Sequence, residues 1–162
     1  MLLDHKSGRR RFRRIAWGQT SYPLIKPYDL SFVRLFAYES VWVCIEDEAG
    51  TIGLGEAVAL PGYGWETTES IVVVVRRMLE NAAALSEAEL VQRAAVEREQ
   101  HPFAASAVMT ALELPAYLDG GHTKRFPLNG PVSAEEPELQ FRKDVACQLG
   151  NGFPYIKVKV GA

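Results

Sequence analysis

The chain has 162 residues and a formal net charge of −2, with 48% hydrophobic and 23% charged residues. This balance is typical of a soluble globular protein with a core, and it excludes a largely disordered chain. The longest apolar run, residues 71–75, is far shorter than the roughly 20 residues that span a bilayer, so we expect no membrane partner. The N-terminal segment lacks the apolar stretch of a secretory signal, and we therefore expect a cytoplasmic protein.

The first 14 residues form a basic arm, whereas the rest of the chain is acidic. The arm holds six of the 18 Lys and Arg residues and one of the 20 acidic residues. Such an arm can bind nucleic acid by neutralising phosphates. This reading is disfavoured because Phe12 is the arm's one aromatic residue and no nucleic-acid-binding motif follows it. We interpret residues 1–14 as a solvated basic tail.

Three β-strands are predicted after this tail. Residues 32–46 are rich in Val, Phe, Tyr and Trp, and apolar residues alternate along 41–46, as is typical of a half-buried strand. Turn residues follow at 47–50, and a second β-like pattern covers 51–59. An earlier strand at 15–25 is expected to pair with these two. The pattern therefore predicts a three-stranded antiparallel meander.

Helix signals begin directly after the meander. Residues 66–68 provide an N-cap and first-turn acid for a helix through 71–79. Ser86 and Glu89 have the spacing of a capping box and predict the start of a second helix. The N-terminal domain is therefore of the α+β class.

A third helix is predicted to begin at Pro102, because proline is favoured at the first helical position. Pro115 is expected to kink or end this helix, and the Asp-Gly-Gly sequence at 119–121 to break the chain. These signals place the end of the α+β domain at about residue 124, so that this domain covers residues 15–124.

The remaining residues, 125–162, predict a strand-helix-strand unit. A short strand is expected at 126–129 and a β-branched strand at 155–160. Between them, an amphipathic helix is expected at 135–149, with its apolar face formed by Leu139, Val145, Ala146 and Leu149. Two strands joined by a helix of this length are expected to be parallel. One such unit cannot close a barrel, so we read it as the incomplete start of a (β/α) barrel.

Two lysines on the last strand are the candidate catalytic residues. Side chains alternate along a strand, so Lys157 and Lys159 are expected to project from the same face. Repulsion between two neighbouring ammonium groups favours a neutral amine, which is able to act as a base. The same short pattern also fits a solvated strand face, and spacing alone does not separate the two readings.

Five segments, in sequence order, resemble the mandelate racemase/muconate lactonizing branch of the enolase superfamily. The last one is similar to the second strand of that family's barrel, and the others are similar to its capping domain. The resemblance implies an enolase-type N-terminal capping domain followed by a truncated barrel. The segments are residues 22–27, 47–57, 61–67, 101–112 and 152–161.

The resemblance implies an Mg²⁺-dependent racemase, epimerase, cycloisomerase or o-succinylbenzoate-synthase-like enzyme that removes a proton α to the carboxylate of a small molecule. Lys159 would be the general base, and Lys157 would stabilise the enolate or orient the base. The family binds Mg²⁺ through acids on the third to fifth barrel strands. We therefore expect no metal ligand in this chain and no activity of the chain alone.

The resemblance also implies two mobile capping loops that close over the substrate. Asp29, Ser31 and Phe32 would lie on the first loop, and Tyr63 and Trp65 on the second. Ordinary turn structure is an equally good reading of these residues.

The role of Glu56 and the overall role of the chain each have two possible interpretations. Glu56 has the chemistry of a metal ligand or an acid, but its place in the capping domain favours a structural role. The alternative to an enzyme is a noncatalytic capping-domain remnant that serves as a binding module. In either case the exposed apolar faces of an incomplete sheet predict one of two outcomes: self-association into a homo-oligomer, or partial disorder beyond about residue 126.

Overall fold

The computed structural model describes residues 11–30, 32–118, 127–134 and 137–160. The proximity of Cα atoms divides the chain into two compact units. The first unit comprises Met1–Tyr28 and Val33–Gly120, and the second comprises Asp29–Phe32 and Gly121–Ala162. Within the described ranges, no helix combines the length and the apolar character needed to cross a membrane.

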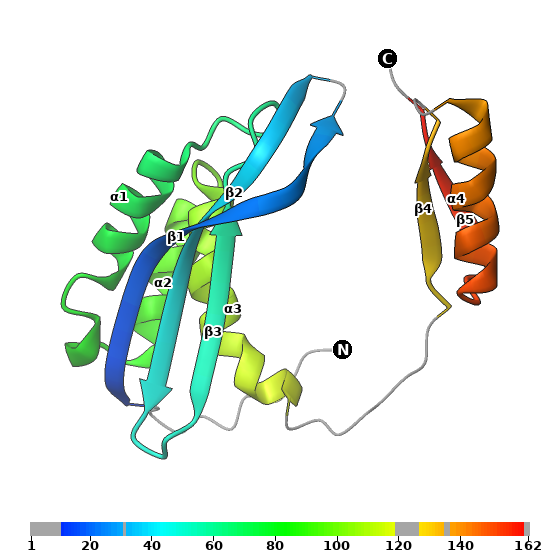
Figure 1. The fold of residues 1–162 in the computed structure, drawn as a ribbon. Coiled ribbons are helices and arrows are strands. Elements are labelled where there is room, and N and C mark those ends of the chain that lie inside the picture. The colour runs from blue at the N-terminus through cyan, green and yellow to red at the C-terminus, as the bar shows by residue number, and fades with distance from the viewer. Residues whose placement is uncertain (1–10, 31, 119–126, 135–136, 161–162) are drawn as a thin grey trace. The chain divides into compact units, whose positions relative to one another are not determined.

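The first unit is built on a three-stranded antiparallel sheet. Its strands are β1 (Phe12–Leu30), β2 (Val33–Asp47) and β3 (Ile52–Val58), in the order β1-β2-β3 (Figure 1). A tight turn joins β2 to β3, in which Gly50 has a φ of +83° and donates its N–H to the Asp47 carbonyl over 3.0 Å. The predicted meander is confirmed.

The first strand begins earlier than the sequence indicates. It starts at Phe12 rather than at Ile15, because the Phe12 side chain is part of the core and only 6% exposed. Arg13, which we expected in the solvated tail, forms an ion pair with Glu46 of β2 over 3.4 Å. The end of the predicted tail is thus part of the sheet, and residues 1–10 lie outside the described ranges.

Three α-helices follow the sheet and pack against one of its faces (Figure 1). They are α1 (Thr68–Leu79), α2 (Glu87–Glu97) and α3 (Pro102–Leu118), with a 3₁₀ turn, η1 (Ala82–Ala84), between α1 and α2. Their number and order agree with the sequence prediction, and α3 begins at Pro102 as expected.

Capping boxes begin α1 and α2. The Thr67 hydroxyl accepts the Ser70 N–H over 3.2 Å, and the Thr67 N–H donates to the Ser70 hydroxyl over 2.9 Å. Ser86 and Glu89 make the equivalent pair of bonds at 3.3 and 2.7 Å. Each box satisfies N–H groups that have no partner within the helix. The predicted helix starts are therefore confirmed.

The third helix does not end at Pro115, and the prediction of an end there is wrong. The helix continues to Leu118. A proline inside a helix removes one backbone hydrogen bond and its ring crowds the preceding turn, yet the helix continues for three residues beyond Pro115. The break predicted at 119–121 lies outside the described residues.

The core of the first unit lies between the sheet and the helices. Val41, Val43 and Ile45 of β2 are fully buried, and the residues between them point to the other face of the sheet. Their partners on β3 are small, so helix α3 can approach the strand closely. These partners are Ala57, Gly55 and Gly53.

The second unit contains a parallel strand pair and one helix. Its elements are β4 (Asn129–Ser133), α4 (Glu138–Gly150) and β5 (Tyr155–Lys159), with β4 and β5 parallel (Figure 1). The sequence prediction of the first strand at 126–129 is wrong. Pro127 has no N–H to donate to a ladder, and the burial alternation begins only after it.

Helix α4 packs on the strands through a different face from the one predicted. Phe141, Val145 and Gln148 are half-buried, whereas Leu139 and Leu149 are largely exposed. The spacing of the half-buried residues is four and three, so they form one stripe of the helix. The amphipathic pattern was therefore assigned to the wrong residues, Val145 excepted.

Candidate active site

The two candidate catalytic lysines share one face of the strand pair in the second unit. In the register of β4 and β5, Pro131 pairs with Lys157 and Ser133 pairs with Lys159. The alternate residues of β4 point to the α4 side: a β-carbon added at Gly130 would lie 2.8 Å from Cβ of Gln148 on α4. The lysines therefore lie on the face that α4 does not cover.

The lysine face also includes one predicted loop residue. The Lys159 ammonium lies 3.5 Å from the Asp29 carbonyl oxygen, a distance at the outer limit of a hydrogen bond. Asp29–Phe32 is grouped with the second unit. Phe32 is 50% exposed, and Ser31 lies outside the described residues. Asp29 is thus the residue of the first predicted loop that the structure places beside Lys159.

The second predicted loop lies in the first unit, between β3 and α1. Its tip is a turn in which the Tyr63 N–H donates to the Leu60 carbonyl over 3.1 Å, and Gly62 has a φ of +90°. Tyr63 is 67% exposed and Trp65 is 70% exposed. Both aromatic rings are therefore accessible to a ligand, although the sequence pattern alone does not distinguish them from ordinary turn residues.

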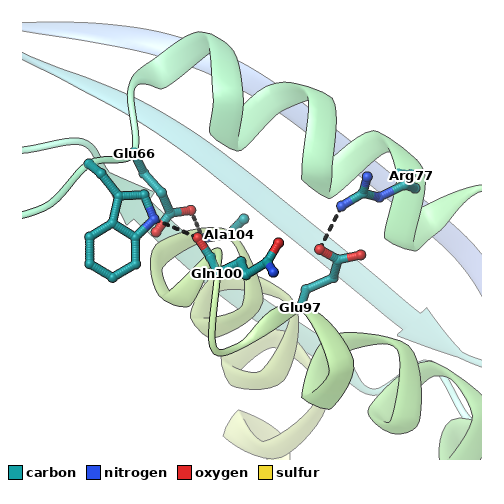
Figure 2. A network of polar contacts seen from close by, with 6 residues as sticks. Glu66, Arg77, Glu97, Gln100 and Ala104 are labelled. Atoms are coloured by element: carbon teal, nitrogen blue, oxygen red, sulfur yellow. Dashed lines mark hydrogen bonds and ion pairs between the residues drawn. The ribbon is translucent and has the colours of Figure 1, made fainter.

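The end of this loop is fixed to the start of α3. The Trp65 indole N–H donates to the Gln100 carbonyl over 2.6 Å (Figure 2). The Glu66 carboxylate, only 4% exposed, accepts the N–H of Phe103 over 2.6 Å and the N–H of Ala104 over 3.1 Å. A buried carboxylate at a helix N-terminus is stabilised by these donors and by the helix dipole.

Sequence reasoning missed this role of Glu66. Glu66 directly precedes the cap of α1 and was interpreted as an acid of that helix, whereas its partners lie 37 and 38 residues further along the chain. The one relevant signal is Pro102: a proline at the first helical position leaves the next two N–H groups as the first available donors. That signal predicts that some acceptor caps α3, but it does not identify Glu66 as the acceptor.

Glu56 has a structural partner, in keeping with the role that we favoured for it. The hydroxyl of Ser40, which is fully buried, donates to the Glu56 carboxylate over 2.5 Å. Ser40 and Glu56 come from the paired strands β2 and β3. The bond satisfies a buried hydroxyl that would otherwise lack a partner.

Magnesium does not fit the described part of the chain. Mg²⁺ needs several oxygen donors that converge on one point. Among residues 11–30, 32–118, 127–134 and 137–160, no three His, Cys, Asp or Glu side chains are grouped so that they could hold a metal ion. We therefore derive no chemical step through a metal from these residues.

Two curated proteins are similar to this chain, and no protein-family model matches it. The L-Ala-D/L-Glu epimerase of Bacillus subtilis (strain 168) is 28% identical over 162 residues, covering 91% of this chain and 44% of the epimerase. The L-Ala-D/L-amino acid epimerase of Populus trichocarpa is 26% identical over 159 residues, covering 86% of this chain and 36% of that protein. The chain thus spans less than half the length of these relatives.

Solved structures show the same fold. The dipeptide epimerase from Cytophaga hutchinsonii, complexed with Mg and the dipeptide D-Ala-L-Val, matches with a TM-score of 0.74 and 23% identity, over 94% of this chain and 44% of the epimerase. A mandelate racemase/muconate lactonizing protein from Herpetosiphon aurantiacus matches with a TM-score of 0.73 and 21% identity, over 94% of this chain and 46% of that protein. The resemblance to the enolase superfamily is confirmed: this chain has the fold of the capping domain and the first barrel strands of a mandelate racemase/muconate lactonizing-type protein.

Proposed function

We propose that this chain provides the capping domain and the catalytic lysines of an epimerase that acts on small carboxylates, with dipeptides as the first substrates to test. The observation that carries the proposal is the placement of Lys157 and Lys159 on one strand face that α4 leaves uncovered. The similarity to two epimerases supports the reaction type. Dipeptides are chosen because a solved neighbour is a dipeptide complex.

In the proposed reaction, the side-chain amine of Lys159 removes the proton α to the substrate carboxylate. The C–H bond breaks, an N–H bond forms, and the electron pair passes into the carboxylate as an enolate. Lys157 lies two residues away on the same face, at about 7 Å along the strand. Its ammonium group stabilises the negative charge that develops on the oxygen atoms. Returning a proton to the opposite face inverts the configuration, and the resemblance assigns that second acid to a later strand.

We propose a role for Mg²⁺ only in an enzyme with a complete barrel. The Cytophaga hutchinsonii structure contains Mg and a dipeptide. When bound, Mg²⁺ would stabilise the enolate as a Lewis acid. The residues described here would contribute the base and the capping surface but no ligand set. That these 162 residues alone are inactive stays a prediction.

The proposal is tested by α-proton exchange in D₂O. The natural gene product that contains these 162 residues is incubated with L-Ala-L-Glu and Mg²⁺, and the α-proton signals are followed by ¹H NMR. We expect one α-proton signal to disappear and the signals of an epimer to grow. If neither change occurs with a panel of dipeptides, the noncatalytic binding module becomes the better reading.

The domain boundaries and the association state are part of the same proposal. We propose a capping domain that ends at about residue 124 and a barrel segment at 125–162, in a cytoplasmic protein. The start of the capping domain moves from residue 15 to Phe12, where β1 begins. Several large apolar side chains in the second unit are exposed, and this supports self-association through the strand pair and α4. These residues are Leu128, Leu139, Leu149, Tyr155, Val158 and Val160.

A further inference from the structure

A pocket of about 400 Å³ lies in the first unit, between the end of α1 and α2. It is formed by residues within 77–81 and 92–97, and we call it the α1–α2 pocket. We propose that this pocket binds a zwitterionic small molecule of the α-amino acid class with an apolar side chain. The pocket lies wholly within the first unit, so its occupant is independent of the proposed function.

Two arginines give the α1–α2 pocket its positive charge, and the protein holds both in place. Arg93 donates from Nη1 to the carbonyls of Met78 and Glu80 over 3.2 and 2.7 Å. Arg77 of α1 pairs with Glu97 of α2 over 2.6 Å (Figure 2). A guanidinium group carries five N–H donors in a rigid fork, so an arginine held through one nitrogen still offers donors to a carboxylate.

The donors that remain on Arg93 are the first candidates for a carboxylate of the ligand. No residue of the described ranges accepts a hydrogen bond from its Nε or Nη2. Because the two carbonyl contacts already fix this side chain, binding costs it little conformational entropy. Asn81 and Gln92 also line the pocket, and each adds a carboxamide that can donate to the same group.

Glu80 gives the α1–α2 pocket a negative charge for an ammonium group. It caps the end of α1, and it is exposed. Glu97, the other acid of the lining, already pairs with Arg77. Within the described part of the chain, no cation pairs with the Glu80 carboxylate. A simple anion would use only the arginine donors, whereas a zwitterion uses both kinds of charge.

The rest of the lining indicates the size and character of the ligand. Val96 is 68% exposed, and the buried Met78 also lines the pocket. An apolar side chain of the ligand can cover this surface and remove it from water. The volume of about 400 Å³ lies at the low end of small-molecule sites, and this favours a single amino acid over a larger metabolite.

The test is an NMR titration of the ¹⁵N-labelled 162-residue chain with three probes. L-leucine carries both charges, 4-methylpentanoate lacks the ammonium group, and 3-methylbutylamine lacks the carboxylate. We expect L-leucine to shift the amide signals of residues 77–81 and 92–97, with a millimolar Kd. Each of the other two probes is expected to bind about threefold more weakly or worse, because it loses one charge contact.

Glu80→Gln tests the ammonium contact, because it keeps the length of the side chain and removes its charge. We expect it to weaken L-leucine binding up to about fivefold and to leave 4-methylpentanoate binding unchanged. Glu99→Gln is the matched control, since it removes the same charge from an exposed residue outside the pocket. It is expected to leave the binding of both probes unchanged.

Three results would overturn the inference. If L-leucine shifts no signal in 77–81 or 92–97 up to its solubility limit, the pocket is not a site for this class of ligand. Equal affinity for the three probes would mean that apolar contact alone drives binding. Equal effects of Glu80→Gln and Glu99→Gln would mean that Glu80 does not contact the ligand. The comparison of the probes uses the unmodified chain, so it does not depend on the folding of either variant.

Discussion

The carbonyl oxygen of Ala107 lies so close to Gly55 that a β-carbon at position 55 would be 1.8 Å from it. The α3 backbone thus rests directly on β3, with no side chain between them. Helix α3 presents buried alanines to the strand, at positions three and seven residues after Ala104. The sheet and helix α3 are therefore held together by direct backbone contact.

Gly55→Ala is expected to destabilise the first unit by about 3 kcal/mol, because a helix backbone cannot give way as a side chain can. Urea unfolding followed by tryptophan fluorescence measures this, since all three tryptophans lie in the first unit. Gly18→Ala is the matched control. Its added β-carbon would meet the end of the Trp42 ring at 2.5 Å, and this ring can shift. If Gly18→Ala lowers the free energy of unfolding as much as Gly55→Ala does, the contact with the helix backbone is not what makes position 55 sensitive.

Arg93 is expected to matter more for stability than Arg77, although Arg77 makes the more obvious ion pair. Arg93 donates to the carbonyls of Met78 and Glu80 over 3.2 and 2.7 Å, and so satisfies acceptors at the end of α1. Arg77 pairs with Glu97 over 2.6 Å, but its side chain is 56% exposed (Figure 2). We expect Arg93→Ala to lower the free energy of unfolding by about 1–2 kcal/mol, and Arg77→Ala to lower it by less than about 1 kcal/mol.

The same urea experiment compares the two arginine variants. Both substitutions remove one positive charge and a long side chain from neighbouring helices, so each serves as the control for the other. Equal losses would mean that the surface charge, rather than the capping of α1, determines the effect.

Local patterns in the sequence predicted the elements, and contacts across the chain decided the rest. The alternation in β2 and the capping box at Ser86 depend on residues within a few positions of one another, so they could be read directly. The role of Glu66 depends on amides 37 and 38 residues away, and the burial of Phe12 depends on a core that only the folded sheet creates. The shared face of Lys157 and Lys159 followed from strand alternation alone.

The capping box of α2 predicts a pH dependence of stability. The Ser86 backbone N–H, and then its hydroxyl, lower the pKa of Glu89 below its usual value of 4.5. A carboxylate whose pKa is lower in the folded state stabilises the fold fully above the unfolded-state pKa. This contribution is lost as the pH falls from about 4.5 through the lower folded-state pKa.

Glu89→Gln keeps an acceptor for the Ser86 N–H but cannot ionise. We therefore expect the unmodified chain to have the higher urea midpoint at pH 7, and the two midpoints to converge as the pH approaches 3. The measurement is a series of urea titrations between these pH values. A difference that stays constant over the whole range would show that the negative charge of Glu89 does not stabilise the helix.

Lys159→Ala is expected to reduce α-proton exchange in the active enzyme about 10²- to 10⁴-fold, the usual contribution of a general base. Lys157→Ala should cost less, because it removes charge stabilisation and leaves the base in place. Lys143→Ala, at an exposed position of α4, removes the same group away from the strand face and is the control. The assay is loss of the α-proton signal in D₂O. If Lys143→Ala and Lys159→Ala behave alike, the two strand lysines form only a solvated face, and the noncatalytic reading gains support.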